Sequence, residues 1–363
     1  MGRVRQLQRD DLSRVVELNN KLFPTSVRIP FEDQLTLFER VCFKNPWHDN
    51  DITSLVYEDD QGVLAGFLCV LARPMLLGSR QIRAAVFQHM MVDRSTLASF
   101  QMFRALVEGP QDFSMGENAV DVVCKLWTRL GHPVSRLNSI YWRRFLKPVS
   151  IAAHQAARRS SLRAVARASM PVCRAVDALL ERIPGNPLRV GSHDRRAVSS
   201  QIDEELETAM MLGELPRMTT ACALHPVYTA ETLDWLLHLL SEETRNGRLQ
   251  KKLVRDPSGA IDGWYIYYLN SEGPSPVFQI AAVSEQKIGH VLDHLFAHAQ
   301  MHGALELTGR IEPRYMKALR EKRCYFMPGR NWMLVHSHDP EILHAIDRGD
   351  AFLSRLEGDL WVL

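Results

Sequence analysis

Apolar residues in the first part of the chain recur with two different periods, and the change of period divides it into elements. A spacing of three and four residues predicts helices, whereas alternating or continuous apolar runs predict strands. A polar turn at Asp59–Gly62 predicts a hairpin between two of these strands. In chain order we expect a strand at 4–7, helices at 12–22 and 31–43, strands at 52–57, 63–72 and 81–92, a helix at 98–107, a strand at 113–115, a helix at 119–130 and a strand at 140–142.

The second part of the chain repeats this order after a change of composition. From Lys147 to Arg174 every charged residue is basic, and the Pro- and Gly-containing stretch 183–187 is typical of a linker. We therefore expect an N-terminal domain at 1–147, a basic helical linker at 148–187 and a C-terminal domain at 188–363. The expected elements of the last domain are a strand at 189–191, helices at 200–212 and 229–243, strands at 250–255, 263–269 and 277–283, a helix at 287–302, a strand at 305–309, a helix at 314–321 and strands at 324–327 and 332–336.

Composition narrows the functional classes. A length of 363 residues with 24% charged and 46% hydrophobic residues is ordinary for a two-domain globular protein. A formal charge of +2 gives no general reason to expect nucleic acid as a partner. The six cysteines form no C-x-x-C pair, and no apolar run reaches the length of a signal peptide or a membrane span. We expect a cytoplasmic protein without a transmembrane segment.

Residues 63–104 carry the most specific pattern. Two long apolar strands lead through a polar turn into a helix, so backbone N–H groups at the helix N-terminus are placed to receive a pyrophosphate. This segment, with the order of elements around it, resembles the acetyl-CoA-binding core of the GNAT (N-acetyltransferase) superfamily. The resemblance extends to both halves. It implies an α/β (α+β) fold of two GNAT-like domains, each a mixed, mostly antiparallel twisted sheet flanked by helices, and a bacterial enzyme.

The resemblance also implies cofactor-binding residues. GNAT proteins carry Gln/Arg-x-x-Gly-x-Gly/Ala at the pyrophosphate loop. The first half matches it in part, with Leu97 at a glycine position, and the second half keeps Gln286 and Gly289 but has Val291 at the last small position. The preceding strand end would align the pantetheine arm of the coenzyme. The expected acetyl-CoA contacts in the first half are Met91, Val92, Arg94, Ser95, Thr96, Leu97, Ala98 and Ser99.

Three residues are candidates for proton transfer. An amine must be neutral when it attacks a thioester, which calls for a general base, and the leaving thiolate takes up a proton. Glu117, at the end of the fifth strand, is our first choice for the base, and His89 on the fourth strand is the second. Tyr141 is the candidate acid, because a tyrosine is the usual donor in GNAT proteins. Residues of these types more often have a structural role, and that alternative stays open for each of the three.

Four histidines recur every fourth residue at His290, His294, His298 and His302. This spacing can place neighbouring imidazoles on one helix face and hold a metal ion, but four such positions drift around the helix and cannot all meet one ion. We expect no metal, and we interpret the histidines as the solvated flank of a helix whose apolar residues face the core.

Arginines at 159, 163 and 167 share a helical face, which could meet an acyl carrier protein or another anionic surface or could simply be solvated.

The sequence and this resemblance thus predict an acyltransferase that moves an acyl group, most simply acetyl, from a CoA thioester to a small-molecule amine by direct attack. Two alternatives stay open. An acyl-carrier-protein-dependent N-acyltransferase would account for Arg159, Arg163 and Arg167, and a non-catalytic GNAT-like scaffold would account for the incomplete phosphate loops.

Overall fold

A computed structural model describes residues 2–24, 29–93, 96–157, 163–180, 204–329 and 331–358. The chain forms two compact units, each built from segments that are distant in sequence. Unit 1 comprises Met1–Ser139, Ala221–Leu237 and Arg330–Leu363, and unit 2 comprises Ile140–Thr220 and His238–Gly329.

Unit 1 contains an eight-stranded mixed sheet. Its strands are antiparallel except for one parallel pair, β4 with β5. Along the sheet the order is β1 (Arg3–Gln6), β2 (Leu55–Glu58), β3 (Leu64–Leu77), β4 (Arg80–Val92), β5 (Phe113–Ala119), β14 (Trp332–Ser337) and β6 (Val134–Ser135), and β8 (Leu224–Pro226) pairs with β3 outside this order.

Helices cover both faces of this sheet because its strands are apolar on both sides. The buried side chains of α1 (Leu12–Leu22) and α2 (Phe31–Cys42) pack with Phe67 and Cys69 of β3. Those of α3 (Thr96–Val107) pack with Leu68 and Val70, which point to the opposite face. The remaining helices with residues in unit 1 are α4 (Asp121–Arg129), α12 (Pro340–Arg348) and the first part of α9 (Ala230–Glu242), and short 3₁₀ turns lie at Arg9–Asp11 and Leu137–Ser139.

Unit 2 contains a six-stranded mixed sheet of the same kind. The order is β13 (Tyr325–Pro328), β7 (Ile140–Phe145), β12 (Glu306–Arg310), β11 (Pro274–Ala282), β10 (Ile261–Leu269) and β9 (Arg248–Arg255), with β11 and β12 parallel. Its buried core includes Trp142, Tyr265 and Phe296. The helices of this unit are α5 (Pro148–Ala157), α6 (Arg163–Leu180), α8 (Thr208–Thr219), α10 (Glu285–Met301) and α11 (Met316–Glu321), with a 3₁₀ turn at Pro313–Tyr315.

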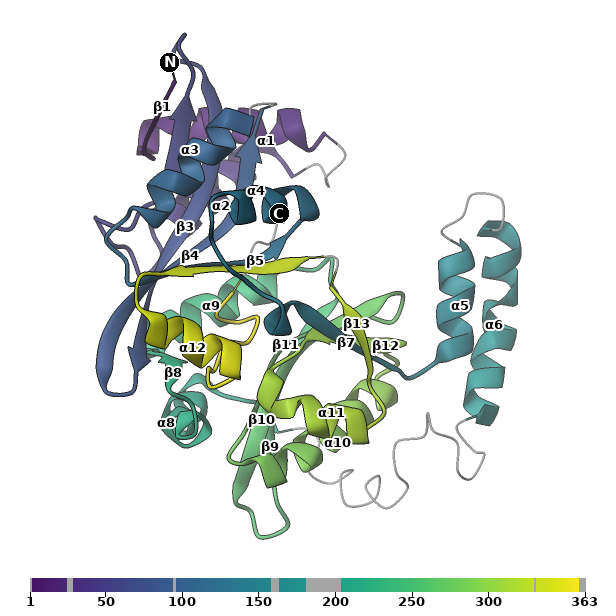
Figure 1. Cartoon of the computed structure of the whole chain (residues 1–363). Helices are drawn as coiled ribbons and strands as arrows, with labels where there is room; N and C mark the ends of the chain where they lie inside the picture. Colours follow the sequence, from purple (N-terminus) through teal and green to yellow (C-terminus); the bar gives the residue numbers. More distant parts are fainter. Residues whose placement is uncertain are drawn as a thin grey trace. The chain divides into compact units, whose positions relative to one another are not determined.

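The two sheets exchange a strand. β7 follows the first half of the chain, yet it pairs with β12 and β13 in unit 2. β14 comes from the end of the chain and pairs with β5 and β6 in unit 1. In Figure 1 the yellow β14 accordingly runs beside the blue β5. The two-part α/β fold is confirmed, while the domain limits at 147 and 187 stay a prediction.

The structure corrects one predicted helix. Within the segment 200–212, the described residues 204–207 are not helical: Glu205 forms an isolated bridge with Lys252 of β9, and α8 begins at Thr208. Leu206 N donates to Lys251 O at 3.0 Å, so backbone groups that a helix would use are committed to a neighbouring strand. The strand predicted at 189–191 lies outside the described residues.

The solvated interpretation of the α10 histidines is wrong for two of the four. His294 and His298 are buried, and Nδ1 of His298 lies 2.7 Å from the Tyr267 hydroxyl. His290 instead pairs with Asp262, at 2.7 Å between Nδ1 and Oδ2. The apolar residues of the helix do face the core, as predicted: Leu292, Leu295, Phe296 and Ala299 all belong to it.

Candidate functional site

The parallel pair of strands in unit 1 separates part of the way along its length. β4 and β5 pair from Ala84↔Phe113 to Phe87↔Gly116, and then both strands continue without pairing to each other. Beyond this point β4 stays paired with β3, and β5 pairs with β14. Within the described residues, no strand pairs with Met90–Val92 on the side that faces β5. This stretch of β4 can therefore offer backbone groups to a ligand.

A glycine makes the last parallel pair possible. A Cβ at Gly116 would lie 2.2 Å from Cε2 of Phe87, closer than any side chain tolerates. The Phe87 ring fills that space and packs against Phe103 and Trp127, with ring centroids 5.8 and 5.4 Å away. Gly116 thus sets the point at which the two strands diverge.

His89 lies in a bulge directly after that point. The register of β3 with β4 shifts around it, and its φ of 45° is unusual for a residue other than glycine. Its Nε2 lies 3.1 Å from Asn19 Oδ1 on α1, which favours the tautomer protonated on Nε2. The rings of Phe23, Phe38 and Phe67 surround it at centroid distances of 5.8, 6.0 and 6.5 Å. Burial lowers the pKa of His89 to about 3, so the ring is neutral at physiological pH.

Glu117 lies on β5 just beyond the last parallel pair, and it is buried. Its Oε1 is 3.6 Å from Nε of Arg355. A Cβ at Gly358 would lie 2.0 Å from its Oε2, so the C-terminal segment reaches this carboxylate through a residue without a side chain. Asn118, next along the strand, has a φ of 62°. The carboxylate therefore lies at the start of the divergence, next to Gly358.

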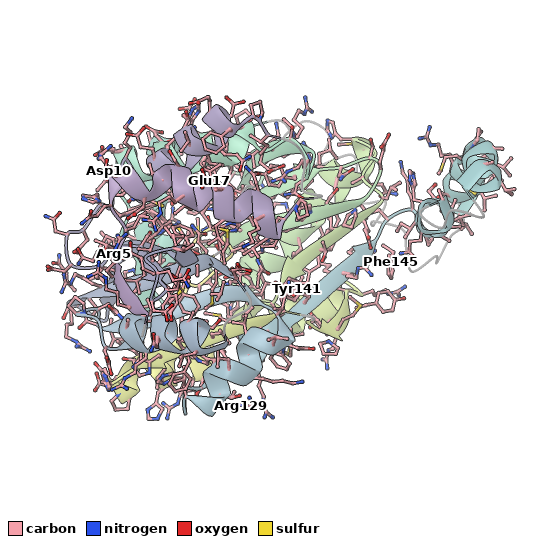
Figure 2. The ribbon with its side chains drawn as sticks, turned by 90° about the horizontal axis from the view of Figure 1, so that it is seen from above. Arg5, Asp10, Glu17, Arg129, Tyr141 and Phe145 are labelled. Carbon is pink, nitrogen blue, oxygen red and sulfur yellow. The ribbon has the colours of Figure 1, made fainter. Side chains whose placement is uncertain are left out.

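Tyr141 belongs to unit 2. It lies on β7, opposite Arg310 of β12 and Met327 of β13. Figure 2 shows Tyr141 and Phe145 on this same strand. Of the three candidates for proton transfer, the structure thus places Glu117 and His89 in unit 1, at the diverging strands, and Tyr141 in the other unit.

The predicted pyrophosphate loop is described only in part. Arg94 and Ser95 lie outside the described residues, and α3 begins at Thr96, four residues after β4 ends. Leu97 is 50% exposed and Ala98 is buried, so the leucine that replaces glycine points its side chain toward solvent. Met91 is buried and Val92 half-buried at the end of β4. The order of strand, short loop and helix N-terminus suits a pyrophosphate-bearing coenzyme.

A buried polar network on the sheet of unit 1 was not predicted from the sequence. Arg73 of β3 is buried, its guanidinium lies 3.7 Å from the ring centroid of Trp47, and its Nη2 donates to Leu356 O at 3.4 Å. Glu357 accepts from Ser354 N and Oγ, both at 2.6 Å, and from the Tyr228 hydroxyl. Burial lowers the pKa of Arg73, although the neighbouring Tyr228 and Glu357 oppose this.

This network fixes the segment 354–358, which also contacts Glu117. The sequence contains one indication of this network, namely that Arg73 directly follows a long apolar run. A charge next to such a run needs buried partners if the strand continues through it. The partners themselves, at Tyr228 and Glu357, follow more than 150 residues later and had no pattern of their own.

In unit 2 the corresponding helix N-terminus borders a pocket. Gln286 and Gly289 lie in the first turns of α10 and line a pocket of about 280 Å³ together with Arg314 and Lys317. Arg314 is committed to Glu312, at 3.0 Å, and to Met218 O, at 3.4 Å.

Comparison with solved structures defines the fold class. The chain is similar to a probable N-acyltransferase from Enterococcus faecalis V583, with a TM-score of 0.55, 10% identity and coverage of 93% of this chain and 73% of that chain. It is also similar to N-myristoyltransferase from Saccharomyces cerevisiae with bound myristoyl-CoA and inhibitors, with a TM-score of 0.51, 11% identity and coverage of 92% and 79%. No protein-family model and no curated protein matches the sequence.

These likenesses and the sheet topology show that the chain has the GNAT fold in tandem. In the part of the chain that the structure describes, no helix is long and apolar enough to cross a membrane. The same described residues include no group of three or more His, Cys, Asp or Glu side chains that could hold a metal ion.

Proposed function

We propose that this protein is an N-acyltransferase that transfers an acyl group from a CoA thioester to an amine, and that unit 1 holds the thioester. The observation that carries this proposal is the divergence of β4 and β5 after Phe87↔Gly116. In the chain, α3 begins four residues after the end of the diverging strand β4. Unpaired backbone of β4 can hold the pantetheine arm, and the N-terminus of α3 can hold the pyrophosphate. Structural neighbours that include an N-myristoyltransferase with bound myristoyl-CoA support this class of donor.

The chemistry is a direct displacement. The lone pair of a neutral amine attacks the thioester carbonyl carbon, the carbon–sulfur bond breaks, and the amide and CoA leave as products. The amine gives up one proton and the departing thiolate takes one, so no other reactant is consumed. A backbone N–H near Met91 would stabilise the developing oxyanion.

Glu117 is the base that we propose. It is a carboxylate at the divergence of the strands, and its Oε1 lies 3.6 Å from Nε of Arg355. His89 lies in the same region, but a pKa of about 3 makes it a weak proton acceptor at neutral pH. Tyr141 remains the proposed acid. The acyl group that we propose is most simply acetyl, and the proposed acceptor is a small-molecule amine. A separate proposal is that an anionic partner contacts Arg159, Arg163 and Arg167.

Calorimetric titration of the full chain with acetyl-CoA, myristoyl-CoA and free CoA tests the donor. We expect micromolar binding at one site and a loss of roughly tenfold or more in the variant Arg94→Glu, because a carboxylate would repel the pyrophosphate. Arg104→Glu is the matched control: it makes the same change of charge toward the other end of α3, at an exposed residue that forms a salt bridge with Glu108.

The outcomes separate the alternatives. Binding that survives Arg94→Glu but is lost in Gly289→Glu would move the donor to unit 2. No binding of any CoA compound would contradict the proposal and leave the non-catalytic scaffold. Preference for an acylated carrier protein over every CoA thioester would instead identify the carrier-dependent reaction.

The choice of base has its own test. With a panel of amino acids, amino sugars and polyamines as acceptors, and acetyl-CoA or myristoyl-CoA as donor, CoA release measures turnover. We expect Glu117→Gln to lower turnover about 100-fold with unchanged donor affinity, and His89→Gln to lower it less than about tenfold. The reverse ranking would identify His89 as the base.

A further inference from the structure

One face of α6 is apolar and open to solvent. Val165, Val172, Val176 and Leu179 are 69%, 64%, 37% and 60% exposed. Their spacing of seven, four and three residues places them on a single helical face. Alanines 164, 168 and 175, also exposed, extend this face between the larger side chains. We call this set the outer face of α6. None of the described residues covers it.

The helix pair that carries the outer face is held together from within. Figure 1 shows α5 and α6 side by side. Asp177 of α6 is buried and accepts from Val149 N at 3.0 Å, Ser150 N at 2.8 Å and Ser150 Oγ at 2.6 Å at the N-terminus of α5. A carboxylate at that end of a helix also meets its positive dipole. The hairpin therefore has a fixed connection on its inner side, and its outer face is not needed for that connection.

The sequence of this hairpin has an excess of basic residues. Between Lys147 and Leu180 the sequence contains one acidic residue, Asp177, and that residue is turned inward. The basic residues are Lys147, Arg158, Arg159, Arg163, Arg167 and Arg174. Arg158 and Arg159 lie outside the described residues, and for Arg163 and Arg167 only the helical backbone is described. Arg174 is exposed.

We infer that the outer face of α6 docks the protein on an anionic phospholipid surface. An exposed apolar helical face combined with an excess of arginine is the pattern of helices that lie in the membrane interface. Each basic residue near an anionic bilayer strengthens binding about fivefold. The absence of surface carboxylates between 147 and 180 leaves nothing there to repel lipid phosphates. This inference concerns a peripheral contact and is independent of the proposed acyl transfer.

Vesicle flotation of the full chain, without any CoA compound, tests the inference. We expect binding to vesicles with one third phosphatidylglycerol in phosphatidylcholine, and roughly tenfold weaker binding to phosphatidylcholine alone. The double variant Val172→Glu/Leu179→Glu should lose roughly tenfold or more of the binding, because the apolar contact is lost and two negative charges face the lipid. Added salt should weaken binding of the unchanged chain.

A matched double variant separates the effect of the position of the substitutions from the effect of the added negative charge. Val63→Glu/Val122→Glu changes two exposed valines of unit 1 and alters the net charge equally, so it should bind vesicles as the unchanged chain does. Circular dichroism shows whether each variant folds. If the α6 variant does not fold, Arg174→Glu decides, and we expect a weakening of about fivefold.

Several results would overturn the inference. One is a full chain that binds neither kind of vesicle, and another is equal binding by the α6 variant and the unchanged chain. A dimer in sedimentation velocity that the α6 variant abolishes, without vesicle binding, would show that a second copy covers the outer face. Binding of an acyl carrier protein in place of vesicles would equally overturn it.

Discussion

Arg5 is the centre of a charge cluster on the first strand, and Figure 2 marks its position. It makes a two-pronged pair with Asp11, at 2.6 and 2.7 Å, and a further pair with Glu58 at 2.7 Å. Both carboxylates are buried, and their other arginine partners are farther away: Arg14 lies 3.4 Å from each of them, and Arg3 lies 3.1 Å from Glu58. Arg5→Met would therefore leave both negative charges with weaker pairing. We expect a loss of about 2–3 kcal/mol in the free energy of unfolding, measured by urea titration. This expected loss is smaller than the loss for a fully buried ion pair, because 21% of the Arg5 side chain is exposed.

Arg3→Met is the control for that measurement, because Arg3 pairs with the same Glu58 at 3.1 Å but keeps 75% of its side chain exposed. We expect a change below about 0.5 kcal/mol. A loss as large as that of Arg5→Met would contradict the role given to burial.

The pH dependence of the unfolding free energy should also distinguish the two variants. Arg5 and Arg3 lower the pKa of Glu58 from 4.5 to about 2, which stabilises the fold above pH 4.5 and is lost as pH falls toward 2. Arg5→Met should flatten that acid limb.

His89 gives a prediction of pH dependence with the same sign and a different cause. Its pKa falls from 6.5 to about 3 because burial disfavours the charged ring. The unfolded chain takes up a proton below pH 6.5 while the folded chain does not, so this residue makes stability fall as pH drops from 6.5 toward 3. His89→Gln should reduce the slope by about 1.4 kcal/mol per pH unit between pH 6 and 4. An unchanged slope in parallel urea titrations would show that His89 is accessible to protons in the folded state.

Individual polar residues could be predicted from the sequence more readily than the environments of their side chains. Glu117 was singled out from its place at a strand end, and the structure does place it at the divergence of β4 and β5. Its contact with Arg355 was not predicted, because a charge pair 238 residues apart leaves no periodic trace. The same holds for His294 and His298: spacing fixes which face a helical residue shares, but not whether that face meets solvent or another layer.

At the scale of elements, Gly116 controls how β4 and β5 separate. In Gly116→Ala a methyl group would collide with the Phe87 ring, which Phe103 and Trp127 hold in place. We expect a loss of about 1–3 kcal/mol in unfolding free energy and weaker binding of acetyl-CoA in calorimetry. Gly213→Ala in α8 is the control, because nothing lies within 4 Å of the added Cβ. It should stabilise the protein by up to about 1 kcal/mol, as alanine favours a helix. Similar losses in both variants would refute the steric explanation.

Most elements could be predicted because their apolar periods are strong, while their pairing partners could not. The helix at 287–302 and the strands at 263–269 and 277–283 match α10, β10 and β11 within a few residues. The strand at 140–142 was also correct, yet it was assigned to the first sheet and lies in the second. An alternating pattern records which faces of a strand are buried, and it contains nothing about the neighbour that completes the backbone hydrogen bonds.

For the whole molecule, the exchange of β7 and β14 makes each unit dependent on the other half of the chain. In unit 1 the core around β4 and β5 includes Met333, Val335, Ile342 and Ile346 from the C-terminal segment. A fragment of residues 1–147 would lack these side chains and would leave β5 without its neighbour β14. A strand edge and an apolar face would both be exposed.

We therefore expect the fragment 1–147 to lack fixed tertiary packing. Its exposed apolar surface should bind a hydrophobic dye strongly, and it should show no cooperative thermal transition, whereas the full chain should unfold cooperatively. The fragment also lacks β8, which pairs with β3 at Met75–Leu77, so adding a peptide of residues 330–358 should restore order only in part. Differential scanning calorimetry of fragment, mixture and full chain makes the comparison. A cooperative transition in the fragment alone would show that residues 1–147 form an independent domain despite the strand exchange, and would support the limit at 147 as a true domain boundary.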